Sequence, residues 1–282
     1  MKRKFLAAKV NINGNIFNQN VKELILEIPT AIKSNHILKS RKSSWAWQFA
    51  DVLEFNHENK QLLSGNFVKA RREFRTVVED GKTKQYEIPY QVAYPSFFIY
   101  DPVSEVLVFE ETGDIQRNHF IDAFERIIFE ANVTIGKIEV KLIPRKEELY
   151  KRIMEIEILT KIEFDLIHPN FYYKEEYEDL SEIIKREKAT RMKTSLENEK
   201  GLNKEGFIIK NGIEMVGQGY GEVKASGFNN VPSRRKGKSK RKVMGFKSRD
   251  SIEMTHVEKN LSEKDFKNTM GTFLNKIINI LV

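Results

Sequence analysis

A period of two in the apolar residues is the feature that most limits how this chain can fold. It starts at Trp45, and Trp47, Phe49, Leu53 and Phe55 then fall on the same side of an extended backbone. Successive side chains of a strand point to opposite faces, so this alternation is typical of a strand with one buried face. The sequence predicts a long, half-buried strand here, with both tryptophans facing the core.

The stretch 61–79 predicts a second long strand with two chemically different faces. Its inward face is apolar and consists of Val68, Ala70, Phe74 and Val78. Its outer face is mostly cationic and includes Lys69, Arg71 and Arg75. These cations allow two interpretations: they cover a solvent-exposed face of the sheet, or they form one wall of an anion-binding groove.

The remaining periodic segments mix helical and strand patterns. Apolar residues at helical spacing predict helices at 18–28, 116–131, 174–186, 204–215 and 262–282. Alternating or short apolar runs predict strands at 5–12, 97–100, 106–110, 136–143, 156–167, 191–196, 222–228 and 252–257. The expected fold class is α+β, with antiparallel or mixed sheets covered by helices. We expect two subdomains, 1–145 and 146–282.

Two turns carry signals of their own. Asp101-Pro102 predicts the turn of a hairpin between 97–100 and 106–110. Ser262 is expected to cap the last helix, with Asp265 three residues on in place of the usual Glu or Gln.

The excess positive charge of the chain is concentrated in the stretch 233–249. The whole chain has 48 Lys plus Arg against 40 Asp plus Glu, and this stretch holds nine of the cations and no acidic residue. They are Arg234, Arg235, Lys236, Lys238, Lys240, Arg241, Lys242, Lys247 and Arg249. Without them the chain would have 39 basic and 40 acidic residues. The stretch predicts a basic hairpin or arm that contacts phosphates.

Nucleotide-binding motifs are absent. The Gly-Lys-Ser at 237–239 lacks the glycine that a P-loop requires five residues earlier, where Pro232 stands. Gly217, Gly219 and Gly221 follow a predicted helix, whereas a dinucleotide fingerprint precedes one. We expect these glycines to form a helix C-cap and turn.

Signals for catalysis are weak. Glu139 with Lys141, and Glu222 with Lys224, have the Glu-x-Lys spacing of metal-dependent nucleases. A highly charged chain contains such triplets by chance. The five histidines are far apart in sequence, at His36, His57, His119, His168 and His256. No catalytic residue, metal ligand or cofactor is assigned, and whether the protein is an enzyme stays open.

Composition limits the cellular setting. The chain has no cysteine, which excludes disulfides and thiolate metal sites. The apolar run near the N-terminus is interrupted by Lys9 and Asn11, so we expect no secretion signal, and no stretch has the length of a membrane span. The expected location is the cytoplasm.

Four segments, in this order, resemble a family of bacterial proteins known as domain of unknown function 4747. They are the tryptophan-bearing strand at Trp45, the segment FFIYDPVSEVLVFEE at 97–111, the His-Pro-Asn at 168–170 and the turn NEKGLN at 198–203. The resemblance implies no activity and no catalytic residue. The basic stretch is not part of the pattern that carries it.

The localised charge predicts a nucleic-acid-binding protein, with DNA or RNA as partner. By analogy with other uncharacterised bacterial families, we expect the protein to be a component of an antiviral or mobile-element system. Two alternatives stay open: a metal-dependent nuclease with an unrecognised site, and a non-catalytic subunit or homo-oligomer that associates through the apolar stripe of its C-terminal helix.

Overall fold

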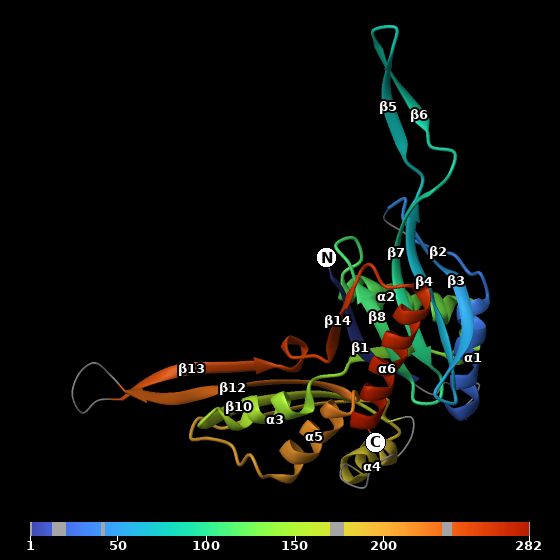
Figure 1. Cartoon of the computed structure of the whole chain (residues 1–282). Coiled ribbons are helices and arrows are strands. Elements are labelled where there is room, and N and C mark those ends of the chain that lie inside the picture. Colours follow the sequence, from blue (N-terminus) through green and yellow to red (C-terminus); the bar gives the residue numbers. More distant parts are fainter. Residues whose placement is uncertain (1, 13–20, 41–42, 170–177, 233–238, 282) are drawn as a thin grey trace. The chain divides into compact units, whose positions relative to one another are not determined.

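The computed structural model describes residues 2–12, 21–40, 43–169, 178–232 and 239–281 (Figure 1). Over these residues the protein is α+β, with antiparallel sheets that include one curled into a half-barrel and a separate sheet of four strands. The predicted fold class is thereby confirmed. No helix in the described ranges is long and apolar enough to cross a membrane.

The larger sheet has eight strands in the order β14-β1-β8-β7-β4-β3-β2, with β9 paired to β1. These strands are β1 Lys2–Ile12, β2 Leu38–Lys39, β3 Ala46–His57, β4 Lys60–Arg71, β7 Val92–Asp101, β8 Val106–Glu111, β9 Ile138–Leu142 and β14 Met254–Glu258. The run from β2 through β3, β4 and β7 to β8 is antiparallel at every step. The predicted hairpin between β7 and β8 is confirmed, and Asp101 caps its turn by accepting hydrogen bonds from Val103 and Ser104.

Two helices, α1 Val21–Lys33 and α2 Arg117–Ala131, pack with this sheet. The apolar side chains of α2 recur at helical spacing, and Phe120 and Phe124 are buried. Their rings contact Phe67 of β4, at centroid distances of 5.0 and 6.1 Å. Helix α1 continues past Pro29 to Lys33, five residues beyond the predicted end, because Ala31 and Ile32 are buried.

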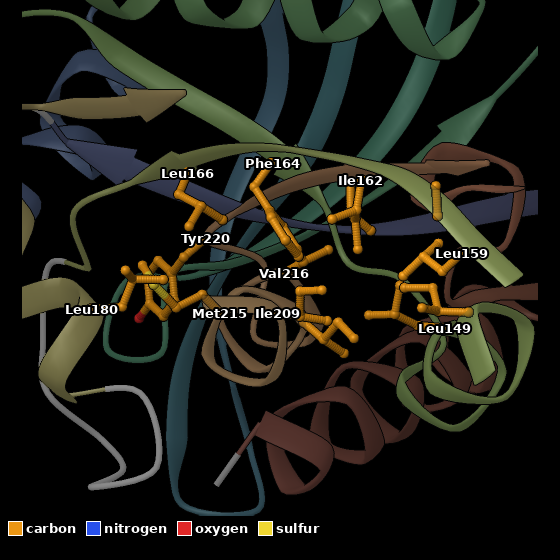
Figure 2. Close-up of a cluster of buried hydrophobic side chains, with 14 of the residues drawn as sticks. Leu149, Leu159, Ile162, Phe164, Leu166, Leu180, Ile209, Met215, Val216 and Tyr220 are labelled. Carbon is orange, nitrogen blue, oxygen red and sulfur yellow. The ribbon is translucent and has the colours of Figure 1, made fainter. Parts of the chain in front are cut away.

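The second sheet has the order β11-β10-β12-β13 and is antiparallel throughout. Its strands are β10 Ile158–Ile167, β11 Arg191–Glu197, β12 Gly221–Pro232 and β13 Ser239–Lys247. Helices α3 Lys146–Met154, α4 Glu178–Arg186 and α5 Phe207–Gly217 supply the rest of its core, which is apolar (Figure 2). Helix α5 contacts β10 and β12 at Gly212, where an added Cβ would lie 2.7 Å from the Phe164 ring.

The polypeptide forms two compact units that are not consecutive in sequence. One contains the described parts of 1–5, 14–138 and 255–272, and the other those of 6–13, 139–254 and 273–282. Helix α6, Glu263–Leu281, and strand β1 contribute to both. The predicted domain ranges, 1–145 and 146–282, are consecutive stretches, and they stay a prediction.

Two predictions about the long strands are wrong in detail. The stretch 61–79 is two strands, since β4 ends at Arg71 and β5 Phe74–Glu79 pairs only with β6 Lys82–Glu87. Phe74 and Val78, predicted to face inward, are exposed, because this two-stranded ribbon continues past β4 and β7, beyond the larger sheet (Figure 1). Leu53 is also exposed, because a bulge between Ala50 and Leu53 changes the register of β3.

The ends of two helices follow the local signals. Ser262 caps α6: its hydroxyl accepts a hydrogen bond from the Asp265 backbone N–H at 3.1 Å and donates one to the Asp265 carboxylate at 2.6 Å. At the end of α5, Gly219 has a φ of +82°. The Tyr220 N–H bonds to Met215 and the Gly219 N–H to Val216, which is a Schellman motif. The predicted glycine C-cap is therefore confirmed.

Candidate functional site

The described part of the basic stretch includes one strand of a hairpin, β13. β12 and β13 are antiparallel, with Val231 opposite Lys240, Asn230 opposite Arg241 and Asn229 opposite Lys242 (Figure 1). Lys240 and Lys242 point to one face of the hairpin and Arg241 to the other, because side chains alternate along a strand. The described end of the hairpin therefore carries positive charge on both faces, while the three residues of β12 opposite these cations are uncharged.

The three cations at this end are exposed, and none of them makes an ion pair with any described residue. The Arg241 guanidinium lies 5.8 Å from the centroid of the Phe228 ring. Asn230, opposite Arg241, donates its backbone N–H to the Glu157 carboxylate at 2.8 Å. The cations are thus free to contact an external polyanion. Arg234, Arg235, Lys236 and Lys238 lie outside the described residues.

Lys247 and Arg249 are placed differently from the other predicted contacts. Lys247 ends β13, and Arg249 follows it in the short 3₁₀ helix Ser248–Asp250. The Arg249 guanidinium donates two hydrogen bonds to Glu222 of β12, at 2.5 and 2.7 Å. Both residues belong to the face of the four-stranded sheet that is opposite its helices, named here the open face.

The register of the strands defines two rows of side chains across the open face. One row consists of Ser195, Glu163, Lys224 and Lys247, each directly opposite the next. The other consists of Lys193, Asp165 and Glu222, with Arg249 hydrogen-bonded to Glu222. These residues line a hollow of about 640 Å³. A second hollow of about 390 Å³ shares Glu163, Lys224 and Lys247 with it, so the two adjoin.

Each carboxylate of the open-face hollow pairs with at least one cation. Asp165 forms a two-armed pair with Arg191, and Glu163 bonds to Lys161 at 2.9 Å. Glu222 bonds to Arg249. Burial acts to raise the pKa of Asp165, but the Arg191 guanidinium acts to lower it, and the balance leaves that pKa below its usual value. Three lysines, Lys193, Lys224 and Lys247, remain in excess, and none of them makes an ion pair within the described part of the chain.

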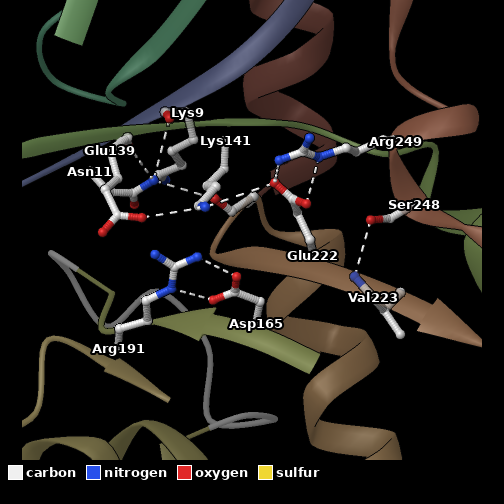
Figure 3. A network of polar contacts seen from close by, with 11 residues as sticks. Lys9, Asn11, Glu139, Lys141, Asp165, Arg191, Glu222, Val223, Ser248 and Arg249 are labelled. Carbon is white, nitrogen blue, oxygen red and sulfur yellow. Dashed lines mark hydrogen bonds and ion pairs between the residues drawn. The ribbon is translucent and has the colours of Figure 1, made fainter. Parts of the chain in front are cut away.

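A network of buried charges adjoins the open face and brings the two Glu-x-Lys triplets together (Figure 3). Lys141 of β9 is buried, and its ammonium lies 3.3 Å from Glu139 of its own triplet and 3.8 Å from Glu222 of the other. Buried Asn11 of β1 donates to the backbone oxygens of Glu139 and Lys9, both at 3.3 Å. Lys141 therefore shares its charge between two glutamates from strands far apart in sequence.

The second basic feature lies in the other compact unit and is already engaged with its surroundings. The Lys69 ammonium and the Arg71 guanidinium lie 4.5 and 4.3 Å from the centroid of the Trp45 ring. Arg71 also pairs with Glu73 at 2.8 Å. Arg75 is exposed on β5. Trp45 and Trp47 are half-buried, and Trp47 stacks on Phe67 at 5.2 Å, as expected of side chains that face the core.

The carboxylates and histidines give no metal site in the described ranges: no three Asp, Glu, His or Cys side chains there lie close enough to hold an ion. His168 directly follows β10, where a turn was expected. The seven apolar residues of the α6 stripe are buried within the chain, namely Phe266, Met270, Phe273, Leu274, Ile277, Ile278 and Leu281. The nuclease and interaction-subunit alternatives stay predictions.

Sequence reasoning missed the lysines that complete the open face. The sequence-based predictions include Lys224 only as part of a Glu-x-Lys triplet, and Lys193 is not among the predicted site residues. Polar or charged residues at every second position of 191–197 and 222–224 were the available signal. That signal does not reveal which strands are neighbours, so the rows could not be assembled before the strand order was known.

Fold and site together define an α+β protein of antiparallel sheets that carries a cationic hairpin and a charged hollow at its base. The chain belongs to the family described as Domain of unknown function (DUF4747), whose model matches residues 4–263. The match confirms the resemblance based on the four sequence segments, and its range includes the basic stretch at 233–249. No curated protein matches the chain.

Proposed function

We propose that this protein binds nucleic acid through the β12–β13 hairpin. The observation that carries the proposal is the exposed run Lys240, Arg241 and Lys242, which lies opposite uncharged residues of β12 and forms no ion pair among the described residues. An unneutralised cationic run attracts phosphates and releases their counterions on binding. A structural role would instead favour alternating opposite charges, as in the cross-strand pair of Lys161 and Glu197 on the same sheet.

The geometry also favours contact with the nucleic-acid backbone over recognition of the base sequence. A two-stranded ribbon can enter the major groove of DNA or follow a single strand. Its polar side chains here are mainly Lys and Arg, which contact phosphates, and asparagines Asn229 and Asn230. Asn229 is occupied, because it accepts from the Glu157 N–H and donates to the Glu155 oxygen. We therefore expect binding with a steep salt dependence and little base preference.

The test is the dependence of affinity on salt concentration. Labelled duplex DNA, single-stranded DNA and single-stranded RNA are titrated by fluorescence anisotropy with the parent protein and with a triple variant, Lys240→Gln, Arg241→Gln and Lys242→Gln. For duplex DNA each lost phosphate contact reduces the slope of log K against log salt by about 0.9, so the triple variant should lose roughly 2 to 3 units of slope.

A matched control separates local contact from overall charge. Lys200→Gln, Lys259→Gln and Lys264→Gln together remove the same charge from exposed lysines outside the hairpin. The control is expected to keep the parent slope. An unchanged slope in the hairpin variant, or an equal loss in the control, would overturn the proposal.

A further inference from the structure

Lys224 and Lys247 lie directly opposite each other on β12 and β13, and neither has a carboxylate partner among the described residues. Like charges at such a position are destabilising, since the Cβ atoms of opposed residues are only about 5 Å apart. Glu163 lies directly opposite Lys224 on the other side but bonds to Lys161 instead. The arrangement has a cost to folding that no ion pair of these lysines offsets within the described residues.

We propose that the open-face hollow binds a phosphate monoester, with Lys224, Lys247 and Lys193 as its cationic contacts. A monoester carries a charge of about −1.5 to −2 at neutral pH, which matches a pair of opposed lysines better than the single charge of a diester does. The third lysine lies one row away, opposite Asp165.

The neighbouring groups favour an external anion over an internal one. Each carboxylate of the hollow already pairs with a cation: Asp165 with Arg191, Glu222 with Arg249, and Glu163 with Lys161, which also pairs with Glu197. Rotation of any of them toward the excess lysines would break an existing pair. Ser195, at the end of the first row, adds a hydroxyl that can donate to a phosphate oxygen. The volume of about 640 Å³ falls in the range of small-ligand sites, roughly 300 to 1,000 Å³.

Two sources of a monoester fit this chemistry: a free nucleotide and the phosphorylated end of a nucleic-acid strand. On the open face, Lys247 and Arg241 are six residues apart along β13, which is about 20 Å of extended chain. Between them lie Gly245 and Val243, opposite Ser226 and Phe228. A strand end held in the hollow could therefore continue along the hairpin.

The experiment uses the full chain and three probes: a nucleoside 5′-monophosphate, an oligonucleotide phosphorylated at its end, and the same oligonucleotide with a hydroxyl end. Affinities are measured by isothermal titration calorimetry for the parent, Lys224→Gln and Lys193→Gln, neither of which lies in the hairpin run. Loss of one charged hydrogen bond predicts about tenfold weaker binding of the phosphorylated probes in each variant. The control Lys264→Gln, an exposed lysine of the other compact unit, should leave binding unchanged.

The pattern of results separates the sources and the two proposals. Binding of the nucleotide assigns the site to free nucleotides, and preference for the phosphorylated oligonucleotide alone assigns it to strand ends. Equal affinity for both oligonucleotides together with no nucleotide binding, or no loss in Lys224→Gln, would overturn the phosphate site. If the hairpin variant keeps its affinity for duplex DNA while Lys224→Gln loses the phosphorylated probes, the hairpin proposal fails and the hollow stands.

If a variant binds none of the probes, a stability measurement distinguishes loss of folding from loss of the phosphate contact. Thermal unfolding without ligand should show Lys224→Gln to be folded and at least as stable as the parent, because it removes the repulsion with Lys247. The monophosphate should raise the melting temperature of the parent above that in chloride at equal ionic strength, and should not do so for Lys224→Gln. An equal rise in both proteins would contradict the proposal.

Discussion

The Lys141 ammonium lies 3.8 Å from the Glu222 carboxylate, so the lysine of one Glu-x-Lys triplet contacts the glutamate of the other. The same ammonium lies 3.3 Å from Glu139. Both glutamates and the lysine are largely removed from solvent. Three residues of the two triplets, which resemble nuclease motifs when read along the sequence, thus form one ion-pair network in space, and Lys224 is outside it.

Replacement of Lys141 tests how strongly this network supports the fold. Lys141→Met leaves two carboxylates without the cation between them, and breaking a buried pair in this way typically costs about 3 to 5 kcal/mol. We expect the free energy of unfolding in urea to fall by about 3 kcal/mol. The control Lys137→Met, at an exposed position just before the same strand, should change it by less than about 0.5 kcal/mol. A loss of similar size in both variants would show that the network contributes little.

The contact between α5 and β10 requires a residue without a side chain at position 212. An added Cβ would lie 2.7 Å from the Phe164 ring, which is itself buried and cannot move away freely. We expect Gly212→Ala to lower the free energy of unfolding by about 1 to 3 kcal/mol, as overpacking does elsewhere. Gly113→Ala is the matched control, because nothing lies within 4 Å of its added Cβ. An equal free energy of unfolding for Gly212→Ala and this control would contradict the close approach of α5 to β10 at Gly212.

The stability of the protein should depend on pH through His168. Burial lowers the pKa of His168 below its usual value, the nearby Lys185 acts in the same direction, and Glu182 opposes them. The unfolded chain has a histidine pKa of about 6.5, so below that pH it binds a proton more readily than the folded protein does. His168 therefore does not lower the free energy of unfolding at higher pH, and it lowers this free energy as the pH falls through about 6.5.

The measurement is the free energy of unfolding in urea between about pH 5 and 8, for the parent and for His168→Gln. The variant should lose less stability on acidification than the parent. The two curves should keep a constant separation above about pH 7, where the imidazole is neutral in both states. Parallel curves over the whole range would exclude His168 as a source of the dependence.

Much of the fold follows from local pattern. The helical spacing of Phe120 and Phe124, the alternation of Ile162 and Phe164, and the cap at Ser262 each locate an element within a few residues of where it lies. The errors occur where a tertiary effect overrides the pattern. Leu53 leaves the core because of a bulge, and Phe74 is exposed because its ribbon extends beyond the sheet. Helix α3, Lys146–Met154, is not among the helices that the sequence predicts.

The candidate site divides in the same way. The hairpin could be predicted from the sequence, because its cations are adjacent along the chain and no acidic residue interrupts them. The hollow could not, because Lys193, Lys224 and Lys247 come from three strands.

By itself, the sequence determined the α+β class, the family and the concentration of charge in one segment, since these depend on composition and short-range periodicity. Only the tertiary structure decided that β12 lies between β10 and β13, and hence that Lys224 is opposite Lys247 and that Glu222 contacts Lys141. The physical reason is that strand pairing joins residues by hydrogen bonds across the sheet. Neighbours in space are then set by strand order and register, which the spacing of residues along a single strand does not encode.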